Sequence, residues 1–218
     1  MATTPRSDDT RDDTRSDGIR IAAARLPGPA DRRAFTARGC LAVEGLWDDR
    51  CAAALAHEAG RLLPRGRRAG PDGPERPSRQ AVAADAPLLA RLHRALVPLA
   101  RALAGRLLVP TCAWYNYYEQ HDGIWLHIDI DASELALLTT VLGEVGPLHL
   151  HPALRGRTQD QLDALQRDPD WDRHSGTAVR YPRRGVLAQL GRAVPHHRPG
   201  RPLARPGAVA ALHYRSPF

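Results

Sequence analysis

Lysine is absent from this chain of 218 residues, and all 31 basic side chains are arginine. The absence excludes any mechanism that needs a lysine amine, such as Schiff-base formation. The formal net charge is +7, but the arginines are scattered rather than gathered into a patch with interleaved aromatic residues. Because nucleic-acid-binding domains typically carry such a patch, we expect no nucleic-acid partner.

Cysteine and long apolar runs are also scarce. The three cysteines, Cys40, Cys51 and Cys112, are widely spaced and contain no C-x-x-C pair, which argues against a disulfide framework or a structural zinc site. No run approaches the roughly 18 to 20 apolar residues of a membrane helix, and no apolar stretch follows a basic start as in a secretory signal. We therefore expect a soluble, cytoplasmic protein without a membrane partner.

Residues 1–18 are polar and charged and contain no large apolar residue after the initiator. Such a segment has too little apolar surface to bury, so we predict a disordered tail. Residues 19–218 are the right length for a single domain with one hydrophobic core. Within that domain, the Arg-, Gly- and Pro-rich stretch 64–78 is expected to form a loop.

The first half of the domain is predominantly helical in pattern, and the second half is strand-like. One helix is expected after Asp48 or Asp49, either of which can cap it, through Leu63. A second, long helix is expected over 87–107, where Pro98 should kink it or split it in two. One later helix is expected near 158–167, with Thr158 and Gln161 as a capping box. Short alternating runs predict strands at 111–119, 123–130, 136–143, 146–151, 185–190 and 207–215. The fold class is therefore α+β with a mainly β core, a sheet sandwich or small barrel braced by N-terminal helices.

The segment GIWLHIDI, residues 123–130, carries the strongest chemical signal. Alternate residues of a strand share a face, so His127 and Asp129 should project together. The aliphatic residues between them should form the other face and pack beneath the helices of the first half. An imidazole and a carboxylate on one face are good ligands for a divalent metal, and a second histidine would complete a 2-His-1-carboxylate facial triad.

The second histidine is expected from AVPHHRPG, which follows a predicted strand and contains His196 and His197. Adjacent residues of an extended chain face opposite ways, so only one of the two can join His127 and Asp129. Strand alternation alone leaves the choice between them open.

The order H-x-D, then a distal histidine, then arginine near the last strand resembles the iron(II)/2-oxoglutarate-dependent dioxygenase superfamily. The resemblance spans residues 35–218. The opening AFTARGCLAVEGLWDD is similar to phytanoyl-CoA-hydroxylase-like members, the N-Y-Y run before H-x-D is similar to AlkB-like members, and prolyl-hydroxylase-like enzymes share the overall order. The branch is unresolved. The resemblance implies a double-stranded β-helix (a cupin-like jelly roll), Fe(II) and 2-oxoglutarate as cofactors, and dioxygen as a reactant. It also implies hydroxylation of a small molecule, amino acid or natural-product intermediate with release of succinate and CO2.

The resemblance also implies roles for individual residues. Iron would be held by His127, Asp129 and His196, which the V-P-H placement favours over His197. Asn116 and Tyr118 would contact 2-oxoglutarate. An arginine would anchor its distal carboxylate, but the family's usual position in the last strand holds Gly207 or Val209. The remaining candidates for the anchor, in order of preference, are Arg205, Arg215 and Arg201.

Two other classes of function fit the same ligands. One is a metal-binding barrel without catalytic activity. The other is a zinc-dependent hydrolase, which would need a nearby general base, with Glu119 or Glu144 as the carboxylate. A second pair of histidines, His149 and His151, shares a predicted strand face and could pack in the core, contact substrate or bind a further metal.

Overall fold

The computed structural model describes residues 26–67, 79–172, 175–182 and 184–218. The predicted tail, 1–18, lies outside the described residues, as does most of the predicted loop 64–78. No helix in the described part of the chain has the length and apolar character needed to cross a membrane.

The described residues form five α-helices, four of them in the first half of the chain. They are α1 (Pro29–Arg38), α2 (Asp49–Leu62), α3 (Pro87–Ala95), α4 (Val97–Ala104) and α5 (Gln159–Arg167), with short 3-10 turns at Leu63–Arg65, Ala83–Asp85 and Pro152–Leu154. The sequence signals act as expected. Asp48 caps α2 by accepting from the Cys51 N–H at 2.8 Å, and Thr158 with Gln161 forms the predicted capping box of α5. Pro98 splits the predicted long helix into α3 and α4, because a proline ring cannot be accommodated in a helix interior.

The strands form two antiparallel sheets. The strands are β1 (Cys40–Val43), β2 (Arg79–Val82), β3 (Val109–Tyr118), β4 (Ile124–His127), β5 (Leu135–Leu142), β6 (Leu148–Leu150), β7 (Thr177–Val179), β8 (Val186–Gln189), β9 (His196–Arg198) and β10 (Gly207–Arg215). The six-stranded sheet has the order β1-β8-β5-β10-β3-β2, and the four-stranded sheet has the order β4-β9-β6-β7. All six predicted strands are present, although several are shorter than expected. The predicted α+β class with a mainly β core is therefore confirmed at this level.

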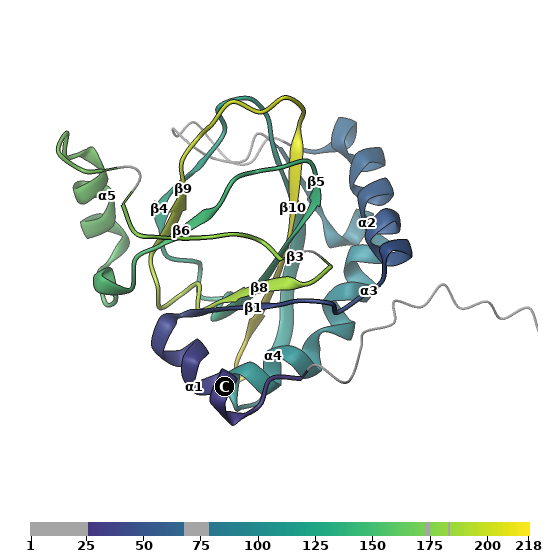
Figure 1. Cartoon of the computed structure of the whole chain (residues 1–218), viewed down its shortest axis with the longest axis horizontal. Helices are drawn as coiled ribbons and strands as arrows, with labels where there is room; N and C mark the ends of the chain where they lie inside the picture. The colour runs from purple at the N-terminus through teal and green to yellow at the C-terminus, as the bar shows by residue number, and fades with distance from the viewer. Residues whose placement is uncertain (1–25, 68–78, 173–174, 183) are drawn as a thin grey trace, which may run out of the picture.

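Two hydrophobic layers hold the molecule together. One lies between the six-stranded sheet and helices α2, α3 and α4, which line one side of that sheet (Figure 1). The other is formed by residues of both sheets, including Tyr118, Leu138, Leu150 and Val209. The facing sheets therefore enclose their own interior.

A buried carboxylate joins the helices to the sheet. Glu58 of α2 accepts from the backbone N–H groups of Leu88 and Leu89, at 2.8 and 2.9 Å, and from the Tyr115 hydroxyl at 2.9 Å. These two N–H groups begin α3 and have no acceptor within that helix. Burial and the neighbouring Glu58 charge raise the pKa of Tyr115 well above its usual range, so its hydroxyl remains a donor.

The expected packing of the strand around His127 was wrong in one respect. Its aliphatic face does not pack beneath the first-half helices. The Leu126 N–H donates to Gln166 of α5 at 2.7 Å, and α5 lies beside the four-stranded sheet at the far end of the molecule (Figure 1). Ile130 is 60% exposed. A register shift in the β4–β9 pairing between Ile124 and His127 also breaks the simple alternation.

Candidate metal centre

His127, Asp129 and His196 are brought together at the edge of the interior between the sheets. His127 ends β4 and lies directly opposite His196, the first residue of β9, in the antiparallel pairing. Asp129 follows β4 in an extended loop and donates its backbone N–H to Gly191 O at 3.0 Å. One ligand atom from each of the three side chains lies within 4.8 Å of the others, a spacing suitable for one metal ion.

Both imidazoles are oriented by backbone carbonyls. His127 Nδ1 lies 2.8 Å from Trp125 O, and His196 Nδ1 lies 3.0 Å from Val194 O. A carbonyl only accepts, so each Nδ1 carries a proton, and in the neutral imidazole that can bind a metal each Nε2 then keeps the lone pair. The two Nε2 atoms lie 3.5 and 3.6 Å from Asp129 Oδ1. The three possible ligand atoms therefore converge.

The second carboxylate oxygen of Asp129, Oδ2, already accepts a hydrogen bond. Ser133 Oγ donates to Asp129 Oδ2 at 2.8 Å and lies 2.5 Å from His213 Nδ1. Because the serine proton goes to the carboxylate, His213 Nδ1 is the donor in the second bond. This chain of hydrogen bonds leaves Oδ1 as the free ligand atom.

Glycine is required next to this carboxylate. A Cβ atom added at Gly191 would lie 1.8 Å from Asp129 Oδ2. Any larger residue would displace the Asp129 side chain or the turn that contains Gly191.

The ionisable groups of the site shift one another's pKa. Burial raises the pKa of Asp129, but hydrogen bonding to His127 and the charge of His196 hold it well below its usual range. Burial lowers the pKa of His127, and the Asp129 carboxylate outweighs this and raises it. Burial lowers the pKa of His213 to about 4, so His213 is neutral near pH 7. Near pH 7 the Asp129 carboxylate is therefore ionised and His213 is neutral.

His197 faces away from the triad. Its Nδ1 lies 2.9 Å from His151 Nε2, and its ring lies 5.0 Å from the rings of His149 and Trp171. His149 Nδ1 contacts Ser175 O at 3.0 Å. This cluster, which we call the outer histidine cluster (His149, His151, Trp171 and His197), lies on the opposite face of the four-stranded sheet. Among the described residues, the geometry groups only His127, Asp129 and His196 as a metal site, and this favours His196 over His197.

The residues predicted to contact 2-oxoglutarate lie in different surroundings. Arg205 and Arg215 are exposed, as is Arg201, and no described contact joins any of them to the triad. Asn116 Oδ1 accepts from Gln80 Nε2 at 2.7 Å. Tyr118 is buried in the interior between the sheets.

An arginine that the sequence patterns did not predict as a site residue lies two positions after His196 in β9. Arg198 shares β9 with His196 and is only 1% exposed. Its guanidinium carbon lies 3.4 Å from the centre of the Tyr118 ring, and none of its three guanidinium nitrogens makes a hydrogen bond within the described structure. Burial raises the pKa of Tyr181 to about 12, against a smaller lowering by the Arg198 charge. The signal available in the sequence was H-x-R, because residues two apart in a strand share a face.

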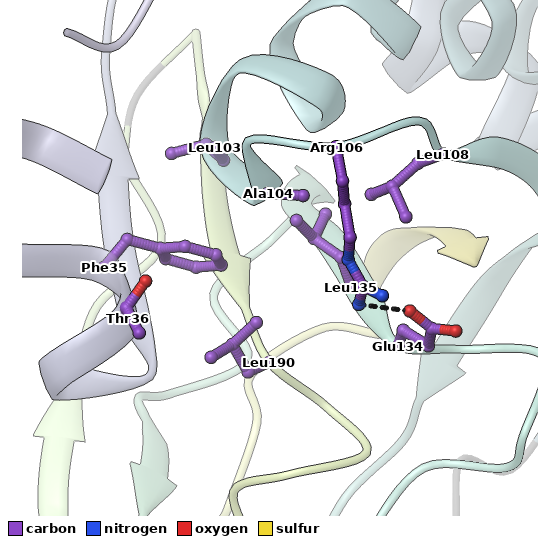
Figure 2. A pocket seen from close by; sticks show the side chains of 9 residues that line it. All are labelled: Phe35, Thr36, Leu103, Ala104, Arg106, Leu108, Glu134, Leu135 and Leu190. Carbon is purple, nitrogen blue, oxygen red and sulfur yellow. Dashed lines mark hydrogen bonds and ion pairs between the residues drawn. The ribbon is translucent and has the colours of Figure 1, made fainter. Parts of the chain in front are cut away.

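A separate pocket of about 140 Å³ lies where α1 and α4 approach the six-stranded sheet. Figure 2 shows its lining, which is apolar except for Thr36 and the ion pair between Arg106 and Glu134 at 2.5 Å. It shares no lining residue with the triad.

No protein-family model and no curated protein matches the chain, but solved structures do. The non-heme alpha-ketoglutarate-dependent carbocyclase SnoK from nogalamycin biosynthesis superposes with a TM-score of 0.70 at 15% identity, covering 89% of this chain and 86% of SnoK. The alpha-ketoglutarate-dependent epimerase SnoN from the same biosynthesis gives 0.68 at 17% identity, with 86% and 82% covered. HygX from Streptomyces hygroscopicus, with nickel and 2-oxoglutarate bound, gives 0.66 at 15% identity, with 88% of each chain covered.

At this level of identity the comparison establishes the fold. The predicted resemblance to iron(II)/2-oxoglutarate-dependent oxygenases is confirmed at that level, without a branch. The chain has the fold of the non-heme alpha-ketoglutarate-dependent enzymes SnoK and SnoN, and of HygX, whose structure contains nickel and 2-oxoglutarate.

Proposed function

We propose that this chain is an Fe(II)- and 2-oxoglutarate-dependent oxygenase that acts on a small molecule. The observation that carries the proposal is the convergence of His127 Nε2, His196 Nε2 and Asp129 Oδ1 in one partly buried site. Two neutral imidazoles and one carboxylate are the donor set of non-heme Fe(II) oxygenases, and they leave coordination positions open for other ligands.

The surroundings also fit 2-oxoglutarate, which carries two carboxylates. The buried Arg198 guanidinium has no hydrogen-bond acceptor in the described structure, and a buried charge without a partner is unfavourable. A carboxylate can accept two parallel hydrogen bonds from one guanidinium. We therefore assign the distal carboxylate of 2-oxoglutarate to Arg198 instead of Arg205, Arg215 or Arg201, with Tyr118 as the surface on which the guanidinium lies. Asn116, which is hydrogen-bonded to Gln80, is not assigned a contact with 2-oxoglutarate.

Each residue has a defined task in this proposal. His127, His196 and Asp129 would hold the iron, and Ser133 with His213 would keep Asp129 Oδ2 turned away from it. Arg198 would orient the co-substrate so that its keto-acid end faces the metal. Leu148, Leu150 and Val209, which lie between the sheets, would keep water from the reacting groups. When bound, iron and 2-oxoglutarate supply the oxidising power for attack on an unactivated C–H bond, with dioxygen consumed and succinate and CO2 released.

We also propose a jelly-roll topology and a reaction type for this chain. The strand orders β1-β8-β5-β10-β3 and β4-β9-β6-β7 support a double-stranded β-helix, or jelly roll. SnoN is described as an epimerase and SnoK as a carbocyclase, so one fold serves different outcomes. We propose hydroxylation of a natural-product intermediate as the first reaction to test, and a single domain over residues 19–218.

The zinc-hydrolase alternative finds no support in the positions of its suggested bases. Glu119 is exposed and lies 3.7 Å from Arg79, and Glu144 is exposed. Neither contacts the triad in the described structure. A hydrolase needs a base within reach of the metal-bound water.

The test is an oxygen-free titration followed by turnover. The protein is loaded with Fe(II), titrated with 2-oxoglutarate and then exposed to oxygen while succinate is measured. We expect 2-oxoglutarate to bind only when metal is present, and succinate to form. Asp129→Ala should lose both responses, and Glu119→Gln should keep them. Metal binding without any 2-oxoglutarate binding would contradict the proposal and favour the non-catalytic barrel.

A further inference from the structure

Gln189, the last residue of β8, contacts the triad from the six-stranded sheet. It is 2% exposed, and its Nε2 lies 3.2 Å from His196 Nε2. In the neutral imidazole, donation from His196 Nδ1 to Val194 O leaves the lone pair on His196 Nε2. The atom facing it must therefore be the amide nitrogen, and this fixes the orientation of the Gln189 side chain.

A metal at the triad would compete with this hydrogen bond. An imidazole nitrogen has one lone pair, which a metal bound to His196 Nε2 would use. The Gln189 amide would then be a buried donor without an acceptor, which is unfavourable. Its Oε1 already has no partner in the part of the chain that is described. The side chain can relieve this only by finding a new acceptor close to the metal.

We infer that Gln189 is a co-substrate-binding residue, whose amide passes from His196 to a metal-bound oxygen of the α-keto acid. The inference rests on the proposed function. The keto-acid end has a carboxylate and a keto oxygen, and both are acceptors. A donor beside His196 suits either oxygen when it binds the metal next to that ligand. Ala136 and Cys40, the residues paired with Gln189 in the neighbouring strands, have small side chains.

This arrangement predicts opposite effects on two affinities. Gln189→Leu removes the donor and keeps a similar volume. Its metal affinity should equal or exceed that of the wild type, because the competing hydrogen bond is gone. Its affinity for 2-oxoglutarate should fall about 10- to 100-fold, the range for a lost hydrogen bond to a charged group. Gln189→Glu should weaken 2-oxoglutarate further, because a carboxylate would face the anionic oxygen, while metal binding is retained.

The experiment is an oxygen-free titration with Co(II), followed by 2-oxoglutarate, with binding read from the cobalt absorption spectrum. Gln166→Leu is the matched control, because Gln166 is also a buried glutamine but contacts Leu126 on the α5 side of β4. It should leave 2-oxoglutarate affinity unchanged. Melting temperatures check folding. Gln189→Asn, whose amide is one methylene closer to the backbone, replaces the leucine variant if that variant is unfolded.

Two results would overturn the inference. One is unchanged 2-oxoglutarate affinity in the Gln189 variants, and the other is a loss of metal affinity as large as the loss of 2-oxoglutarate affinity. The second result would mean that Gln189 only supports His196. Failure of the proposed function would look different, because the wild-type protein itself would then bind no 2-oxoglutarate.

Discussion

His196 and His197 are adjacent, buried and of the same residue type, yet the two faces of β9 give them different surroundings. On the inner face, His196 Nε2 points towards a carboxylate and a second imidazole. On the outer face, His197 is bonded to His151 and packed against Trp171. Burial of histidine is therefore uninformative about function, and the direction of the ring nitrogens separates a metal ligand from a packed side chain.

The largest expected difference between the faces is in metal binding. His127→Ala on the inner face should lose Co(II) affinity by more than the roughly 10- to 100-fold typical of changes around the ligands. His149→Ala, on the outer face, should bind Co(II) as the wild type does. Isothermal titration in the absence of oxygen measures both. Equal losses in the two variants would show that the faces do not differ as described.

The second expected difference is between the buried Arg198 and the exposed Arg205, in 2-oxoglutarate affinity and in stability. Arg198→Met should weaken 2-oxoglutarate on the order of a hundredfold or more, because breaking a buried ion pair from one side costs about 3 to 5 kcal/mol. The same change should stabilise the ligand-free protein. Burying an unpaired charge costs several kcal/mol, which exceeds the roughly 2 kcal/mol of a buried cation–π contact.

Chemical denaturation without ligand measures the stability of Arg198→Met, and Arg205→Met is the exposed control for both effects. If the control weakens 2-oxoglutarate and Arg198→Met does not, the anchor lies near the start of β10 after all.

A third prediction uses glycine. Gly191→Ala places a methyl group against Asp129 Oδ2 and should reduce metal affinity about 10- to 100-fold, as for other changes that disturb a ligand's support. Gly60→Ala in α2 meets no atom within 4 Å and should instead stabilise the protein by about 1 kcal/mol, because alanine favours helix. Metal titration and thermal unfolding of both variants test this. Normal metal binding by Gly191→Ala would mean that Asp129 is not held as the structure has it.

Much of the fold and part of the metal site could be predicted from the sequence, because these features depend on local sequence patterns. Alternating apolar residues located the longer strands, and capping residues and prolines located the helix ends. The H-x-D pair located two of the three triad residues, because residues two apart in an extended segment share a face. The short strands β2, β7 and β9 lacked such a pattern.

The rest of the site depends on pairing between distant strands. Ser133, Gln189 and His213 meet the triad only through the pairing of β5, β8 and β10. Arg198 was missed for a different reason, because buried arginines are rare unless paired and its proposed partner is not part of the chain.

The smallest expected difference between the two faces of β9 is in how each contributes to the pH dependence of stability. In the outer histidine cluster, burial together with the charges of His149 and His196 lowers the pKa of His151 below its ordinary value near 6.5. The folded state therefore binds fewer protons than the unfolded state, and stability should fall as pH drops through about 6.5. On the inner face, the raised pKa of His127 contributes stability that is present below about 6.5 and is lost as pH rises through its folded value.

Denaturation of the metal-free protein between pH 5.5 and 7.5 measures these opposing slopes. His151→Gln should reduce the loss of stability at low pH, and His127→Gln should deepen it. Slopes that change in the same direction in both variants would contradict the assigned environments.

The most direct test compares the adjacent histidines themselves. Wild-type protein, His196→Ala and His197→Ala are titrated with Fe(II) without oxygen and then with 2-oxoglutarate, after circular dichroism has checked that each is folded. We expect one metal ion per chain and metal-dependent 2-oxoglutarate binding in the wild type and in His197→Ala, and neither in His196→Ala. Loss of metal in His197→Ala with retention in His196→Ala would move the site to the other face of β9 and contradict the account.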